Sequence, residues 1–213
     1  MENTNKIAIL GANGKAGKFL VNEALEKGYQ VKILTRNSTN TEKINKNIET
    51  IIGDARNFST IQDLLQGCSA VINAVGQPKN KNESYIFSTV AKHILEAMKE
   101  SKIKRYILIS GGSLNVTGDQ KRIVNKIGAT LFKLFLPKMM QDKYKELQII
   151  QNSEVDWTIV RLPFVIEGNG IGNIKESLVD MPGIKIQNGD IAPFIIKQIN
   201  SDRYVRKCPF ISN

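Results

Sequence analysis

The chain has 213 residues, of which 41 % are hydrophobic and 23 % charged, and this balance predicts a folded α/β domain and excludes a disordered chain. Its one histidine, His93, and two distant cysteines exclude a multi-histidine or CxxC metal site, so we predict no metal. The first residues are polar, and no segment reaches the ~20 apolar residues that span a bilayer. We therefore expect a cytoplasmic protein without integral membrane association.

Short apolar runs alternate with longer amphipathic stretches along the chain. The runs predict strands over residues 6–10, 30–35, 49–53, 70–75, 105–110 and 156–161, with a last short strand near 205–211. The amphipathic stretches predict helices over residues 15–27, 58–66, 84–100, 142–152 and 191–200. Because the strands are almost continuously apolar, they indicate a parallel sheet covered on both faces. We predict one Rossmann-type, doubly wound α/β domain over residues 1–213.

A glycine-rich loop, GANGKAG, joins the first predicted strand to the first predicted helix. Gly11 allows the tight turn, Gly14 lets backbone approach a diphosphate, and Gly17 allows close packing of helix on strand. The amides at the start of the helix and its dipole favour phosphate there. The pattern predicts a dinucleotide site, against the alternative of a plain glycine turn, and its predicted contacts are Gly11, Asn13, Gly14, Lys15, Ala16 and Gly17.

The second predicted strand ends at Arg36, where an acidic residue would bind the ribose hydroxyls of NAD. Residues 37–39 are Asn, Ser and Thr, and the next carboxylate is Glu42. A guanidinium beside hydroxyls suits a 2′-phosphate, and Lys15 could supply a second cation. The sequence therefore favours NADPH, with NADH also possible and a solvated surface arginine as the alternative.

Several longer segments resemble one family in order and spacing: GANGKAGKFLVNEALEKGYQVKILTRN, the Gly53-Asp54 pair, VINAVG, EAMKESKIKRYILIS and DWTIVRLP. Together they cover most of residues 6–165. The chain resembles the NAD(P)H-binding, NmrA-like branch of the atypical short-chain dehydrogenases. Within that branch it is most similar to the group that contains flavin reductase/biliverdin reductase B.

The resemblance implies a role for residues at the carboxyl ends of the strands, where ligands bind in open α/β sheets. It places Asp54 and Ala55 at the adenine and Ser110 at the nicotinamide end. It places a second stretch beneath the adenosine and ribose: Asn73, Ala74, Val75 and Gly76. It places a third along the nicotinamide and substrate pocket: Leu162, Pro163, Phe164 and Val165. Without the resemblance, Asp54 and Asn73 would be interpreted as ordinary turn residues.

The chain departs from the Tyr-x-x-x-Lys motif that short-chain dehydrogenases use for proton donation. Lys143 stands where the motif lysine would fall, but Met139 occupies the tyrosine position and Tyr144 is out of register. One interpretation is a reductase that passes hydride to a flavin or quinone-like acceptor, with Ser110 and Lys143 as its catalytic positioning groups and solvent as proton source.

Two other functions remain open. A non-catalytic, dinucleotide-sensing regulator of the NmrA-like kind would keep the cofactor site and need no tyrosine. A nucleotide-sugar isomerase or epimerase is disfavoured, because that chemistry normally needs the missing tyrosine and a large substrate domain.

Residues 101–145 carry ten Lys and Arg against two acids, which favours anionic partners unless the charge is simply solvated. Within segment 113–140, an amphipathic basic helix is predicted over 121–136, stopped by Pro137, with Ile127, Leu131 and Leu134 on its apolar stripe. This helix could be a lid or packing helix, a partner or dimer contact, or a peripheral membrane anchor. We expect a small-molecule acceptor, for which an anion would suit the basic zone, no nucleic acid, and a monomer or homodimer.

Overall fold

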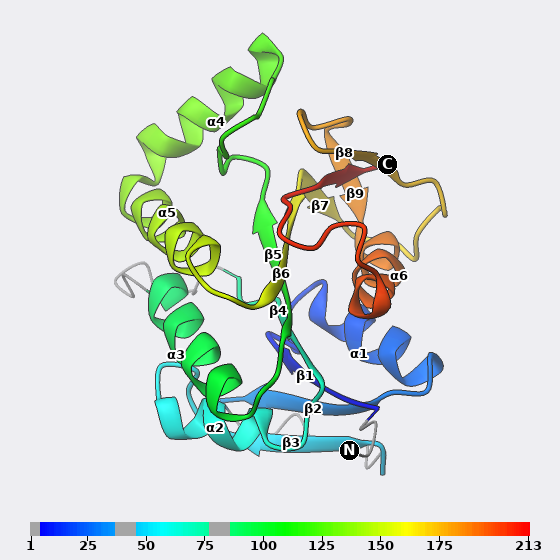
Figure 1. Ribbon diagram of the computed structural model, residues 1–213. Helices are drawn as coiled ribbons and strands as arrows, with labels where there is room; N and C mark the ends of the chain where they lie inside the picture. The colour runs from blue at the N-terminus through cyan, green and yellow to red at the C-terminus, as the bar shows by residue number, and fades with distance from the viewer. Residues whose placement is uncertain (1–4, 37–45, 77–85) are drawn as a thin grey trace.

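The computed structural model describes residues 5–36, 46–76 and 86–213. Eight strands form one sheet in the order β3-β2-β1-β4-β5-β6-β10-β8 (Figure 1). Their bounds are β1 Lys6–Leu10, β2 Gln30–Thr35, β3 Ile48–Ile52, β4 Ala70–Asn73, β5 Arg105–Gly111, β6 Asp156–Leu162, β8 Lys175–Ser177 and β10 Phe210–Ser212. All neighbours pair in parallel except β8, which is antiparallel to β10. The predicted doubly wound sheet is confirmed, with an added antiparallel edge.

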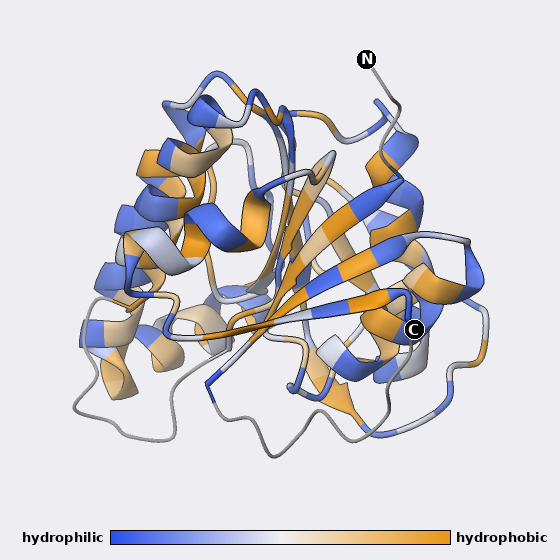
Figure 2. Ribbon diagram, turned by 90° about the horizontal axis from the view of Figure 1, so that it is seen from below, coloured by the Kyte–Doolittle hydropathy of each residue, from blue (hydrophilic) through white to orange (hydrophobic). Residues whose placement is uncertain are grey.

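Helices cover both faces of the sheet, as Figure 2 shows from below. Their bounds are α1 Gly17–Glu26, α2 Phe58–Leu65, α3 Ile86–Glu100, α4 Ile123–Phe135, α5 Pro137–Gln151 and α6 Asn188–Lys197, followed by a 3-10 turn over Gln198–Asn200. Helices α1 and α6 pack on one face, and α2, α3 and α5 on the other. Among the described residues, no helix combines the length and apolar character that crossing a membrane requires.

The strands have apolar side chains on both faces because each face has its own core. In β1, Ala8 and Leu10 belong to the cluster formed with α2, α3 and α5, whereas Ile7 and Ile9 belong to the cluster formed with α1 and α6. Successive strand residues point to opposite faces, so a strand buried on both sides is continuously apolar. This is the physical reason why the apolar runs predicted the sheet.

The structure differs from the predicted elements mainly near the C-terminus. Three short strands went unpredicted: β8, and the pair β7 (Phe164–Ile166) and β9 (Lys185–Gln187), which form a separate two-stranded parallel sheet. The helix predicted from residue 142 begins at Pro137, because proline suits the first helical position and needs no amide partner there. The predicted strand near 205–211 is confined to Phe210–Ser212. The helix predicted from residue 84 is described only from Ile86.

The strand order reverses between β1 and β4. The chain runs from β1 to β2 and β3 on one side, then returns to β4, β5 and β6 on the other. Leu10 and Asn73 are register partners, so the carboxyl ends of β1 and β4 lie side by side. Open α/β sheets bind ligands at such a switch point, which places the glycine loop where a dinucleotide would be held.

A buried arginine ties β6 to the segment that precedes α4. Arg161 is only 1 % exposed; it donates to a carboxylate oxygen of Asp119 at 2.7 Å and through Nη2 to the Cys208 carbonyl at 2.7 Å. Its guanidinium also lies 3.5 Å from the centre of the Phe210 ring. A buried charge needs such partners because water cannot solvate it.

We predict that Asp119→Ala lowers the free energy of unfolding by about 3–5 kcal/mol, because Arg161 is left buried without its counter-charge. Glu23→Ala is the control: it breaks an ion pair with exposed Lys27 and should cost no more than about 0.5 kcal/mol. Urea unfolding followed by circular dichroism measures both. Equal, small losses would show that the Asp119–Arg161 pair contributes little to stability.

Candidate functional site

The glycine loop is packed so closely that side chains would not fit at two of its positions. Gly11 has φ +77°, and a Cβ there would lie 2.4 Å from the Ala74 carbonyl oxygen. A Cβ on Gly17 would lie 2.0 Å from the Gly11 carbonyl oxygen. The Gly14 amide donates to the Gly11 carbonyl at 2.9 Å and closes the turn. The loop therefore needs glycine for backbone contacts, as the sequence predicted for Gly11 and Gly17.

The start of α1 presents a positive helix end to the switch point. Its N-cap residue, Ala16, makes no side-chain cap, and the first turn carries no acid. Asn13 donates through Nδ2 to Thr35 Oγ1 at 3.1 Å, and Asn188 donates to the Lys15 carbonyl at 3.2 Å. These bonds fasten the loop to β2 and α6. Lys15 itself is exposed beside the helix end, where an anion would be attracted by both charge and dipole.

The ends of β2 and β3 bring Arg36 close to Asp54. Hydrogen bonds from Arg56 hold the pKa of the Asp54 carboxyl below its usual range, and the charge of Arg36 adds a smaller effect in the same direction. Arg36 is exposed, and Ala55 is half-buried against the core. Residues 37–39 and Glu42, which entered the cofactor prediction, lie outside the described residues.

The Asn73 side chain is used within the protein. Asn73 is buried; its Nδ2 donates to the Tyr106 hydroxyl at 2.9 Å, and its Oδ1 accepts from the Val75 amide at 3.1 Å. This is the turn role that the residue alone suggested. It fixes the direction in which Ala74 and Gly76 leave the end of β4.

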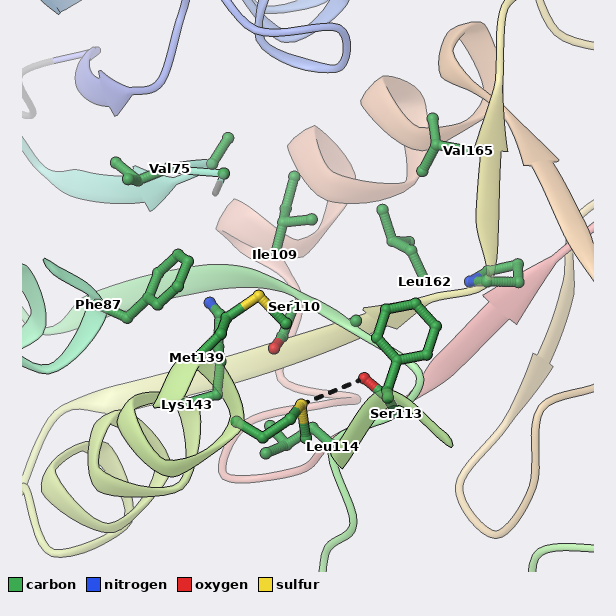
Figure 3. A pocket seen from close by; sticks show the side chains of 16 residues that line it. Val75, Phe87, Ile109, Ser110, Ser113, Leu114, Met139, Lys143, Leu162 and Val165 are labelled. Carbon is green, nitrogen blue, oxygen red and sulfur yellow. Dashed lines mark hydrogen bonds between the residues drawn. The ribbon is translucent and has the colours of Figure 1, made fainter. Parts of the chain in front are cut away.

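A cavity of about 270 Å³ lies at the carboxyl ends of β4, β5 and β6 (Figure 3). It gathers predicted residues from distant parts of the chain: Ala74, Val75, Gly76, Ser110, Lys143, Leu162, Pro163 and Val165. Most of the remaining lining is apolar, including Phe87 and Met139. Phe164 is not part of the lining; its side chain is 70 % exposed, because neighbouring residues of an extended segment point to opposite sides.

The polar side chains of this lining are Ser110, Ser113 and Lys143, all labelled in Figure 3. The Ser113 hydroxyl donates to Met140 Sδ at 3.7 Å. The Ser110 Oγ is buried and has no hydrogen-bond partner among the described residues. Lys143 Nζ lies 2.8 Å from Glu146 Oε2 and 3.7 Å from the centre of the Phe87 ring. A buried, unpartnered hydroxyl is costly, so Ser110 is suited to receive a polar group of a ligand.

Glu146 is a residue that the sequence analysis missed. It is buried, and burial raises the pKa of its carboxyl while the Lys143 charge opposes that rise. It follows Lys143 by three residues on one helix, a spacing that puts both side chains on the same face. This spacing is the sequence signal by which Glu146 could have been found as a neighbour of Lys143. Glu146 holds the ammonium of Lys143 in one orientation at the cavity wall.

Helix α5 is itself fixed by a carboxylate. Asp142 accepts a bond from the Phe87 amide at 2.8 Å and further bonds from the Ser88 amide and hydroxyl. These bonds satisfy amides at the start of α3 that have no partner within the helix. This cap sets Phe87 beside Lys143.

Met139, one turn before Lys143, lies on the same cavity wall (Figure 3). Tyr144 instead packs on the core and accepts a bond from the Asn115 amide at 3.4 Å.

The basic helix predicted over 121–136 is α4, and it stands away from the body in Figure 1. Phe132 reaches the cavity lining, but Ala129 is the one residue of α4 that is buried. Of the three roles that the sequence left open, burial of the apolar stripe against the domain is not what the structure shows, because Ile127, Leu131 and Leu134 are all exposed.

We predict that Gly17→Ala weakens NADPH binding by at least about tenfold, or about 1.4 kcal/mol, because the new methyl group displaces the Gly11 carbonyl. Gly128→Ala is the control, since nothing lies within 4 Å of the added Cβ and affinity should not change. Calorimetric titration measures both, with circular dichroism to confirm folding. An unchanged affinity in the folded Gly17 variant would contradict this account of the loop.

Comparison with solved structures finds the same fold. A short-chain dehydrogenase/reductase of Veillonella parvula in complex with NADP matches with a TM-score of 0.81 at 14 % identity, covering 98 % of this chain and 94 % of that chain. ChuY of Escherichia coli O157:H7, described as an anaerobillin reductase, matches with a TM-score of 0.78 at 16 % identity, covering 97 % and 96 %. At these identities the likeness shows the fold.

Curated relatives are similar over part of their length. YwnB of Bacillus subtilis, described as an uncharacterized protein, is 26 % identical over 159 residues, which cover 73 % of this chain and 70 % of YwnB. The photosystem II assembly factor Ycf39 of Trieres chinensis is 28 % identical over 165 residues, covering 76 % and 46 %. A putative dihydroflavonol 4-reductase of Synechocystis is 27 % identical over 143 residues, covering 64 % and 41 %. The chain thus spans less than half of the length of Ycf39 and of the Synechocystis protein.

A family profile described as NAD(P)H-binding matches residues 11–202, which include the glycine loop and the cavity-lining residues Leu162, Pro163 and Val165. This match bears out the predicted nicotinamide dinucleotide cofactor. The resemblance to NmrA-like atypical short-chain dehydrogenases fits the same assignment. The chain belongs to the NAD(P)H-binding family.

Proposed function

We propose that the protein is an NADPH-dependent reductase that passes hydride to a small conjugated acceptor of flavin or quinone type. The observation that carries the proposal is the cavity beside the switch point. Its wall is mostly apolar. Its polar side chains are Ser110 with an unpartnered hydroxyl, Lys143 with an ion-paired ammonium, and Ser113, whose hydroxyl bonds to Met140 Sδ. Such a wall suits a flat, delocalised ring with a few polar atoms.

Several of the described residues support NADPH as the cofactor of this proposal. The loop from Gly11 to Gly17 has backbone where a Cβ would clash, and the uncapped start of α1 would hold the diphosphate. Arg36 and Lys15 would hold the 2′-phosphate. In this arrangement Asp54 and Ala55 would border the adenine, and Ser110 with Leu162, Pro163 and Val165 would border the nicotinamide.

NADPH, when bound, supplies the hydride. The chain's own residues bind and orient NADPH and the acceptor. The apolar wall excludes water, and Ser110 offers a hydrogen bond. Glu146 orients Lys143 beside the acceptor through the 2.8 Å contact, where the ammonium would stabilise negative charge that builds up on the acceptor. Met139, in the tyrosine position, has no proton to donate. A conjugated acceptor spreads its negative charge and takes a proton from solvent, so the chemistry does not require that tyrosine.

A non-catalytic sensing role is the second candidate. It is favoured by Met139 at the tyrosine position and by the similarity to Ycf39, whose name describes an assembly factor. A sensing protein would retain the dinucleotide site and use its redox state to regulate a partner.

Arg36→Ala should weaken NADPH binding by about tenfold to a hundredfold, the range of one or two charge-assisted hydrogen bonds, and leave NADH binding nearly unchanged. Arg203→Ala, which removes another exposed arginine with an ion pair of its own, is the control and should affect neither cofactor. Titration of each variant with both cofactors gives the ratio of the NADPH and NADH dissociation constants. Equal losses for the two cofactors would show that Arg36 does not bind the 2′-phosphate.

Steady-state oxidation of NADPH with a panel of flavins and quinones tests the reductase directly. We expect turnover in the usual enzymatic range, roughly 1–10³ s⁻¹, with at least one acceptor. The Gly17→Ala variant supplies the background rate. Tight NADPH binding without turnover on any member of the panel would contradict the reductase and support sensing.

A further inference from the structure

Helix α4 carries a continuous apolar surface that the protein does not cover. Its outer face comprises six side chains, each between 46 and 78 % exposed: Ile123, Val124, Ile127, Leu131, Leu134 and Phe135. At 100° per residue they fall on one side of the helix and run along all of its ~20 Å length. A monomer rarely exposes so many large apolar side chains together, so this face indicates an interaction site.

The exposure is built into the fold, since the opposite side of α4 is the one that holds it. Ala129 is buried and Phe132 reaches the cavity. At the start of the helix, Arg122 Nε lies 2.8 Å and Asn125 Nδ2 2.7 Å from the carboxylate of Asp180. These bonds orient the helix so that its outer face is turned to solvent.

The charges around this face are basic except for Asp180, which pairs with Arg122 at the start of the helix. Residues 120–141 contain five basic residues and no acid. Lys126, Lys133 and Lys138 are exposed. Of the flanking acids, Asp142 is buried and the Asp119 side chain is only 8 % exposed, and both accept hydrogen bonds within the domain. A second copy of the chain would oppose positive charge with positive charge. An anionic surface would be attracted instead.

We propose that the outer face of α4 docks on an anionic lipid surface. The apolar side chains would enter the boundary between headgroups and acyl chains, with the helix axis in the membrane plane, while Lys126 and Lys133 contact lipid phosphates from its flank. A lipid surface fits a convex apolar stripe that runs the whole helix and is flanked by lysine. This attachment does not depend on the proposed reductase activity.

Flotation of the full chain with lipid vesicles tests the proposal. Vesicles of equal parts phosphatidylserine and phosphatidylcholine should carry the protein upward, with binding that falls as salt rises. Vesicles of phosphatidylcholine alone should carry much less. No binding to the anionic vesicles at low salt would overturn the proposal.

Two double variants separate the apolar and electrostatic parts. Ile127→Ser with Leu131→Ser should abolish most binding, and Lys126→Glu with Lys133→Glu should lower the partition coefficient roughly thirtyfold or more. Lys92→Glu with Lys99→Glu has the same spacing on the exposed side of α3 and is the charge control; Ile52→Ser, at an exposed position on β3, is the apolar control. Both controls should bind like the parent chain.

Unchanged NADPH affinity in every variant would show that folding and the cofactor site are intact. Equal binding by all variants would overturn the proposal, since neither the apolar stripe nor the lysines of α4 would then contribute to binding. A dimer in sedimentation that the serine variant converts to a monomer, without vesicle binding by the parent, would overturn it in favour of a second copy on this face.

Discussion

Close backbone contact at the first strand–helix junction is the constraint on which the site depends. The missing side chains of Gly11 and Gly17 let β1, the start of α1 and the end of β4 come together, and methyl groups there would overlap carbonyl oxygens. That contact brings the positive end of a helix to the switch point of the sheet. The cofactor site, the direction of the residues that follow β4 and the position of the cavity all follow from it.

The substrate side is organised by buried charges. Lys143 with Glu146, Asp142 at the start of α3, and Arg161 with Asp119 each satisfy a charge away from water. Groups of this kind contribute little net stability, but loss of one partner is costly, so they hold one geometry. They fix α5 against α3 and the segment before α4 against β6, and thereby shape the apolar cavity around Ser110.

The sequence predicted the features that local signals encode. Apolar runs revealed the central strands, and glycine spacing revealed the loop. The contact of Phe87 with Lys143 depends on two helices far apart in sequence, so no local pattern reported it. Strands β7 to β9 have three residues each and little buried surface, too short for a periodic signal. The stripe on α4 was visible, but its exposure was not, because periodicity locates an apolar face without showing what covers it.

The most direct test of the central claim is a nitrogen–proton NMR titration of the labelled protein with NADPH. The account predicts that the amide resonances of Gly11 to Lys18 shift most, followed by those of Arg36 and Ala74 to Gly76, and that the remote end of α3 near Glu100 stays unchanged. Largest shifts away from the β1–α1 junction, or no shifts at all, would contradict the claim that this backbone holds the dinucleotide.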